Sequence, residues 1–171
     1  MRDGRRILDA DAHVIEPAGV FGAAQTPGSE PMDLPPTTPR VPVGDLNKLH
    51  DFLASGASAA EYLRCLDKEG IDAVVLYPSI GLFVPFQPEL DPHVSAESCR
   101  AYNEWLAQYC ATDPTRLTGA ALVPVVDIDL AVAEARHAAT LDLPVVMVRP
   151  NPLYGRTLGA SDFDPLYSAL E

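Results

Sequence analysis

Cysteine is scarce in this sequence, and the few thiols that occur are poorly spaced for structural use. The three cysteines are Cys65, Cys99 and Cys110, and none forms a C-x-x-C pair. The odd number and the wide spacing argue against a disulfide framework and against a zinc knuckle. We therefore expect reduced thiols, as in a cytoplasmic protein.

Positive charge is also sparse, and long apolar runs are missing. Lys and Arg total 12 against 24 Asp and Glu, which gives a formal net charge of −12. Such an acidic chain repels phosphate backbones and anionic lipid, so we expect neither nucleic acid nor membranes as partners. The longest apolar stretch, 73–86, is interrupted by Pro78, Gly81 and Pro85. It is too short and too broken for a membrane span, which needs about 20 apolar residues.

Several signatures of catalysis and nucleotide binding are missing as well. The turn after the second apolar run lacks the G-x-S-x-G pattern of a nucleophilic serine. The chain contains neither a G-x-G-x-x-G run nor a Walker A run. The sequence therefore favours neither a serine hydrolase nor a nucleotide-binding protein.

What the chain does contain is an alternation of buried strands and helices. Apolar runs predict strands at 6–12, 72–77, 117–125 and 144–149, and helical spacing predicts helices at 58–69, 95–111, 129–141 and from 164 onward. The helix ends carry cap signals: Ser58-x-x-Glu61 with Gly70, Asp127 or Asp129 at the start of the third helix, and Asp164-Pro165 for the fourth. This order predicts parallel strands joined by right-handed crossovers.

The predicted architecture is an α/β fold, the N-terminal half of a TIM-like (β/α)8 barrel with about four βα units. We expect residues 1–171 to form one domain that is truncated, because a closed barrel needs about 250 residues. A proline-rich segment at 24–56 follows the first strand and is expected to be a loop or a lid. Two alternatives stay open, namely a half that pairs with another chain and an open doubly wound sheet.

The first strand carries the residues that suggest chemistry. Alternation puts Ile7, Asp9, Asp11 and His13 on one face and Leu8, Ala10, Ala12 and Val14 on the other. The apolar face is expected to lie against the helices, which points the acidic face into the barrel. Asp11 and His13 could then reach a single metal ion, since carboxylate and imidazole together suit Zn, Mn or Fe. The structural alternative is that Asp11 and His13 only form hydrogen bonds with each other or with nearby backbone.

The same strand begins a resemblance to the amidohydrolase-related family, whose members are similar to aminocarboxymuconate-semialdehyde decarboxylase and the resorcylate decarboxylases. It covers nearly the whole chain apart from the proline-rich segment, and the order of the motifs carries it. The matching segments are Leu8-Asp-Ala-Asp-Ala-His-Val-Ile-Glu-Pro17, Glu69-Gly-Ile-Asp-Ala-Val-Val-Leu-Tyr-Pro-Ser79, Tyr102-Asn-Glu-Trp-Leu106 with Arg116-Leu117 and Ala121-Leu-Val-Pro124, and Arg149-Pro-Asn-Pro152 with Gly155-Arg156 and Asp164-Pro-Leu-Tyr167.

The resemblance implies a barrel that holds one divalent metal ion, with Zn preferred over Mn or Fe. Asp11 and His13 would be its ligands from the first strand, and the family's remaining ligands would lie beyond Glu171. The implied reaction is metal-assisted hydrolysis or decarboxylation of a small carboxylated substrate. We expect this chain alone to be inactive. The alternative is a non-catalytic half-barrel that acts as an interaction module.

Three further residues are candidates near the site. Glu16 could support a metal ligand from behind, although a surface position in a loop is an equal alternative. Arg149 and Asn151 follow the fourth strand, where an Arg could hold a substrate carboxylate, with a structural ion pair as the alternative. No catalytic residue is assigned. The expected partner is a small-molecule substrate, and a homo-oligomer is left open.

Overall fold

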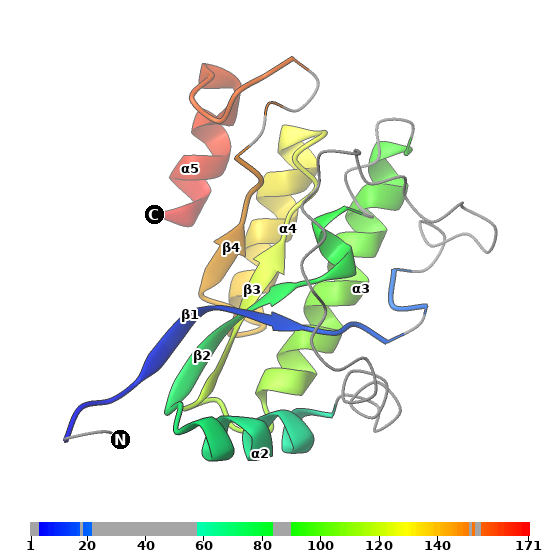
Figure 1. Ribbon diagram of the computed structural model, residues 1–171. Coiled ribbons are helices and arrows are strands. Elements are labelled where there is room, and N and C mark those ends of the chain that lie inside the picture. Colours follow the sequence, from blue (N-terminus) through cyan, green and yellow to red (C-terminus); the bar gives the residue numbers. More distant parts are fainter. Residues whose placement is uncertain (1–3, 18, 22–57, 84–89, 151, 153–154) are drawn as a thin grey trace, which may run out of the picture.

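The fold is an α/β arrangement with one parallel sheet (Figure 1). A computed structural model describes residues 4–17, 19–21, 58–83, 90–150, 152 and 155–171. The strands are β1 (Leu8–Val14), β2 (Ala73–Pro78), β3 (Leu117–Leu122) and β4 (Val145–Met147). The helices are α2 (Ala59–Glu69), α3 (Pro92–Cys110), α4 (Ile128–Thr140) and α5 (Asp164–Leu170), with short 3-10 turns η2 (Ile80–Leu82) and η4 (Ser161–Phe163). The proline-rich segment 24–56, expected to be a loop or lid, lies outside the described residues.

The strands follow one another in the sheet in their order along the chain, β1-β2-β3-β4, and all neighbours are parallel. A doubly wound sheet would reverse direction at a switch point, so that alternative is wrong. Sequential parallel strands with helical crossovers are the arrangement of a (β/α) barrel. Helices α3 and α4 cover one face of the sheet, as Figure 1 shows. The predicted half-barrel is confirmed.

Local cap signals set most of the helix ends. The Ser58 hydroxyl accepts a hydrogen bond from the Glu61 backbone N–H at 3.3 Å, and Gly70 ends α2 in the left-handed region at φ 72°. Asp127 caps α4 by accepting from the Leu130 N–H at 3.0 Å, as predicted. The predicted cap at Asp164 is wrong, because η4 runs directly into α5 and makes Asp164 its first residue.

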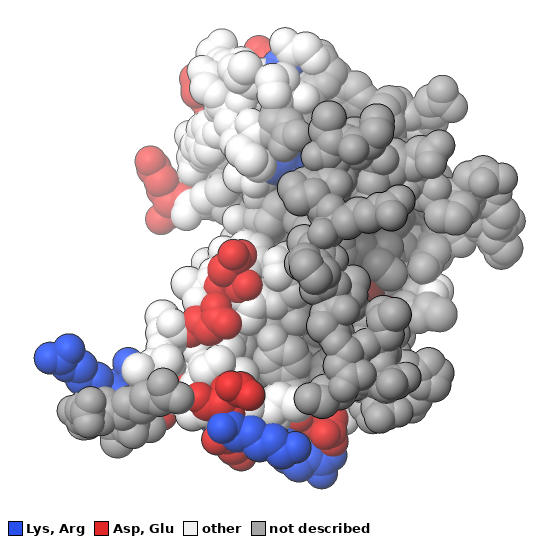
Figure 2. Space-filling view, in the orientation of Figure 1, with Lys and Arg blue, Asp and Glu red and all other residues white. Residues whose placement is uncertain are grey.

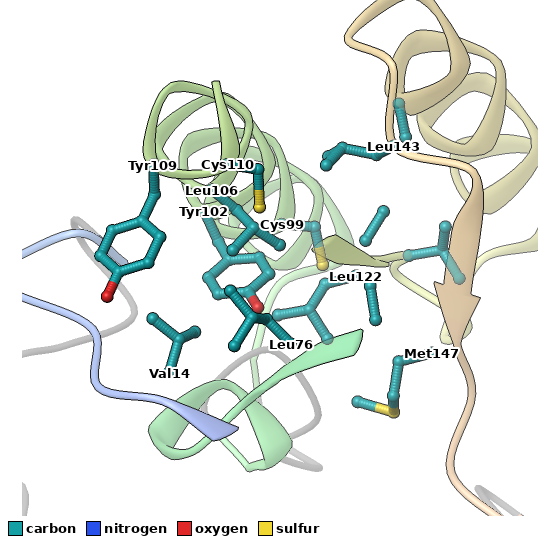
Figure 3. Packing of buried hydrophobic residues seen from close by; sticks show 14 of the residues in the cluster. Val14, Leu76, Cys99, Tyr102, Leu106, Tyr109, Cys110, Leu122, Leu143 and Met147 are labelled. Atoms are coloured by element: carbon teal, nitrogen blue, oxygen red, sulfur yellow. The ribbon is translucent and has the colours of Figure 1, made fainter. Parts of the chain in front are cut away.

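The core lies between the sheet and α3 (Figure 3). Val14, Leu76 and Leu122 come from three neighbouring strands and are fully buried, together with Tyr102 and Leu106 of α3. Burying each such side chain contributes about 1.5–3 kcal/mol. The core therefore fastens the carboxyl-terminal halves of the strands to α3.

The contact between α3 and β3 depends on Gly119. A Cβ atom at this position would lie 2.7 Å from the side chains of both Leu106 and Leu143. That is well inside van der Waals contact, so any larger residue would push α3 away from the sheet. Glycine is the residue that allows this close approach.

A bulge in β1 corrects the predicted alternation. Between two paired positions β1 advances from Asp9 to Ala12 while β2 advances only from Val74 to Leu76, so β1 holds one extra residue. Paired residues of neighbouring strands point to the same side of a sheet, and Val74 is completely buried. Asp9 therefore turns toward the helices.

The side chain of Leu8 points to the face of the sheet opposite the helices. Its side chain is 64% exposed, and its partner across the sheet is Ala73. Ala10 is exposed as well, so the prediction that Leu8 and Ala10 lie against the helices is wrong. The extra residue of the bulge reverses the alternation in the middle of the strand.

The surface agrees with the acidic composition. Figure 2 shows acidic side chains over the middle and lower part of the described surface, with basic side chains mainly at its lower edge. Within the ranges that the structure describes, no helix is long and apolar enough to cross a bilayer.

Candidate functional site

Asp11 and His13 lie in the half of β1 that follows the bulge. Ala12 and Val14 are buried against the core, and the alternating residues Asp11 and His13 are both exposed on the opposite face. His13 is paired with Tyr77 across the sheet, and their rings lie 6.3 Å apart. The structure therefore brings the two candidate ligands to one face, near the carboxyl ends of β1 and β2.

The His13 ring is held by a hydrogen bond to the next strand. Its Nδ1–H donates to the carbonyl oxygen of Pro78 at 2.8 Å. A carbonyl can only accept, so this contact places the proton of the neutral ring on Nδ1 and leaves the lone pair on Nε2. Histidines that bind metal ions usually make such a bond through their other nitrogen. The His13 ring is thus arranged as a ligand would be.

The Asp11 backbone is held by the bulge itself. Its N–H donates to a carboxylate oxygen of Asp9 at 3.0 Å. Asp9 was expected to share the face of Asp11 and His13, and that expectation is wrong. Its carboxylate instead lies near Tyr62 of α2, whose pKa is raised first by burial and then by the charge of Asp9. Asp9 therefore stabilises the backbone of β1 at the bulge.

Glu16 lies behind the site and is only 4% exposed, which rules out a surface position. One oxygen of its carboxylate accepts two backbone hydrogen bonds from the turn after β2, from Ser79 N–H at 3.0 Å and from Gly81 N–H at 2.9 Å. A buried carboxylate needs such partners, because leaving water without them is costly. Glu16 therefore joins the end of β1 to the turn that contains Pro78.

The same turn is tightly packed. A Cβ atom on Gly81 would lie 2.8 Å from Pro78 Cβ and from Leu122 Cδ1, and 2.9 Å from the Phe21 ring. The Phe21 ring stacks on Tyr102, with ring centres 5.8 Å apart. Burial first, and then the nearby Glu16 carboxylate, raises the pKa of Tyr102. These contacts leave the turn little freedom to shift.

Arg149 follows β4 at the same edge of the sheet, because the carboxyl ends of parallel strands meet there. Its guanidinium lies over the Phe83 ring, 5.5 Å from the ring centre. Asn151, the second predicted substrate contact, lies outside the described residues. Arg156, which we did not predict as a site residue, donates to the carbonyls of Val125 and Val126 at 3.3 and 3.2 Å and fastens the segment after β4 to the segment after β3.

The donor set that the structure brings together contains two side chains. Across the described part of the chain, no group of three or more His, Cys, Asp or Glu side chains could hold a metal ion. These two side chains are suitable metal ligands: His13 supplies an imidazole with a fixed tautomer, and Asp11 supplies a carboxylate on the same face. A complete metal site would need further ligands. Sequence reasoning missed the backbone groups of Pro78, Ser79 and Gly81, because no side-chain type marks a main-chain carbonyl or amide.

Solved structures share this fold. An amidohydrolase from Mycobacterium avium subsp. paratuberculosis matches 98% of this chain with a TM-score of 0.71 and 20% identity, over 55% of its own length. A dihydroxybenzoic acid decarboxylase from a Polaromonas species, crystallised with manganese and the inhibitor 2-nitroresorcinol, matches 97% with a TM-score of 0.66 and 21% identity, over 46% of its length.

A third structure, 2,6-dihydroxybenzoate decarboxylase from Rhizobium, matches 97% of the chain with a TM-score of 0.61 and 19% identity, over 46% of its own length. The chain shares its fold with these two decarboxylases and this amidohydrolase. It spans about half the length of these structures. No family model matches the chain, and no curated protein matches it.

Proposed function

We propose that this chain supplies the first-strand part of the active site of a metal-dependent hydrolase or carboxy-lyase that acts on a small carboxylated substrate. The observation that carries the proposal is the bond from His13 Nδ1–H to the Pro78 carbonyl at 2.8 Å, which leaves the lone pair on Nε2, the nitrogen that would bind a metal ion. Asp11 lies on the same exposed face and would add a carboxylate oxygen. The shared fold with decarboxylases and an amidohydrolase supports the same class.

Asp11 and His13 would hold one divalent ion together with ligands that the described residues do not supply. A bound divalent ion polarises a carbonyl or carboxylate, or provides hydroxide at neutral pH. Two structural neighbours were crystallised with manganese, which makes Mn²⁺ the first ion to test, and the sequence-based preference for Zn has no support of its own. The two residues would orient the ion, and the hydrogen bond at Nδ1 would keep the imidazole from rotating.

Arg149 would bind the carboxylate of the substrate. A guanidinium presents donors in a planar fork that matches a carboxylate, and the Phe83 ring supports it from one side. The named substrates of two structural neighbours are dihydroxybenzoates, so we propose small hydroxylated aromatic acids as the substrate class. Asn151 remains a proposed second contact.

The experiment measures Mn²⁺ affinity and turnover in the native protein that carries this sequence. The variants are His13→Ala and, as a matched control, His93→Ala, because His93 is exposed in the first turn of α3 and borders residues of α3 and α4, among them Glu97 and Leu130. We expect His13→Ala to weaken Mn²⁺ binding by at least about 10-fold, in line with losses from disturbed metal sites. His93→Ala should bind as the wild type does.

Turnover is followed as metal-dependent release of carbon dioxide from a panel of hydroxybenzoates, with carboxylate-free phenols as blanks. Loss of this release in His13→Ala but not in His93→Ala would support the function. Unchanged Mn²⁺ affinity in His13→Ala would overturn it and favour a non-catalytic half-barrel that acts as an interaction module.

A further inference from the structure

The ends of β1 and β2 are joined by two reciprocal sets of contacts. His13 of β1 donates from its ring to the Pro78 carbonyl, and the turn that follows Pro78 donates two backbone N–H groups to Glu16. Residues 13–16 therefore contact residues 78–81 from two sides. The partners are 63 to 65 residues apart in sequence, so folding alone brings them together.

The carboxylate of Glu16 determines where the Pro78 carbonyl points. Ser79 N–H belongs to the peptide bond that contains the Pro78 carbonyl, so the bond from Ser79 to Glu16 fixes the plane of that peptide. The second bond, from Gly81, prevents the turn from rotating about the first. The carbonyl on the other side of the same peptide is the one that accepts the His13 proton.

The burial of Glu16 makes this role costly to replace. Glu16 is 4% exposed. The pKa of the neighbouring Tyr102 is raised first by burial and then by the charge of the Glu16 carboxylate. If the carboxylate were absent, two buried or partly buried N–H groups would lose their acceptor, at about 1–3 kcal/mol each. The turn would then relax to find other partners, and the Pro78 carbonyl would move with it.

We propose that Glu16 is a positioning residue that fixes the tautomer of His13 through the Ser79 and Pro78 peptide. It would not touch the metal ion or the substrate. The inference rests on the proposed function, because the position of the ring proton affects activity only if Nε2 binds a metal ion. The tautomer itself can be measured without any metal.

The experiment records nitrogen-15 NMR spectra of the histidine rings in the metal-free chain, at a pH where the rings are neutral. The chemical shifts of Nδ1 and Nε2 distinguish the two tautomers, and the signal missing from His13→Ala identifies His13. The wild type should show the proton on Nδ1. Glu16→Leu should give a mixture of tautomers and weaken Mn²⁺ binding by about 10- to 100-fold, the usual effect of losing support behind a metal ligand.

Two control variants separate positioning from general stability. Glu16→Gln keeps an oxygen that accepts both N–H groups and should keep the wild-type tautomer. Gly119→Ala destabilises the core by crowding Leu106 and should also leave the tautomer unchanged. If Glu16→Leu does not fold, Glu16→Asp takes its place, because one methylene less pulls the carboxylate away from the turn while keeping its charge.

A wild-type tautomer in Glu16→Leu, or in Glu16→Asp where that variant takes its place, would overturn the inference. A mixture of tautomers in these variants, with the wild-type tautomer in Glu16→Gln and Gly119→Ala, would support it. A failure of the proposed function looks different: His13→Ala would bind Mn²⁺ as the wild type does, while the NMR result for Glu16 would still stand.

Discussion

Replacing Asn103 by Leu should destabilise the fold more than any surface change on the same helix. Asn103 is completely buried in α3 and makes three hydrogen bonds through its amide. Its NH₂ group donates to the Leu122 carbonyl and to Glu134 Oε1, both at 2.9 Å, and its oxygen accepts from the Leu122 N–H at 2.8 Å. It therefore connects the end of β3 to α3 and α4.

The size of the effect follows from these partners. The two bonds to neutral backbone contribute about 1 kcal/mol each, and the bond to a carboxylate contributes about 1.5–3 kcal/mol. Glu134 is only 2% exposed and would keep Arg100 as a partner at 3.1 Å. Leucine has a similar volume, so little cavity forms. We expect Asn103→Leu to lower the free energy of unfolding by about 3–5 kcal/mol.

Urea denaturation followed by circular dichroism measures this loss. Glu97→Leu, an exposed position on the same helix, is the control and should change stability by less than about 0.5 kcal/mol. The double variant Asn103→Leu with Glu134→Leu should cost less than the sum of the two single variants, because removing both partners leaves fewer unsatisfied groups. A loss below about 1 kcal/mol for Asn103→Leu would refute the reasoning.

Three other measurements test the packing of the core. Gly81→Ala should destabilise the protein by about 1–3 kcal/mol in urea, because the added methyl overlaps three neighbours, and an unchanged midpoint would contradict the tight turn. Tyr102→Phe should be at least as stable as the wild type, since the buried hydroxyl has no hydrogen-bond partner among the described residues; a loss above about 1 kcal/mol would reveal one. In a thiol-labelling assay at pH 8, Cys65 should react first, because burial raises the pKa of Cys110 to about 12 and that of Cys99 further still; equal rates for the three thiols would refute this.

Features of the fold that depend on short-range signals were predictable from the sequence. Ser58, Gly70 and Asp127 act within one turn of their own helix, so their caps can be identified from neighbouring residues. The strand order also followed from the βα alternation, because short right-handed crossovers place successive strands side by side. Asp164 shows the limit of this reasoning, since the 3-10 turn η4 runs directly into α5 and Asp164 is the first residue of that helix, not its N-cap.

The surroundings of His13 could not be predicted in the same way. The Pro78 carbonyl that binds its ring is 65 residues away, and the amides bound by Glu16 are nearly as far. Which main-chain groups meet depends on the register of β1 against β2, and the bulge that shifts this register is visible only in the pairing of the two strands. The sequence could name His13 as a candidate ligand and Glu16 as a candidate support. Only the fold shows how the one could act on the other.

The bulge in β1 explains why strict alternation predicted one acidic side chain too many, Asp9, on the face of the candidate site. Strict alternation would have placed Asp9 beside Asp11 and His13, and two carboxylates on one face repel each other unless a cation lies between them. The extra residue turns Asp9 toward α2 instead, and its oxygen then accepts the Asp11 N–H at 3.0 Å. The carboxylate that was expected on the same face thus holds the backbone of Asp11. Because the extra residue is visible only where β1 pairs with β2, a strand considered alone could not reveal it.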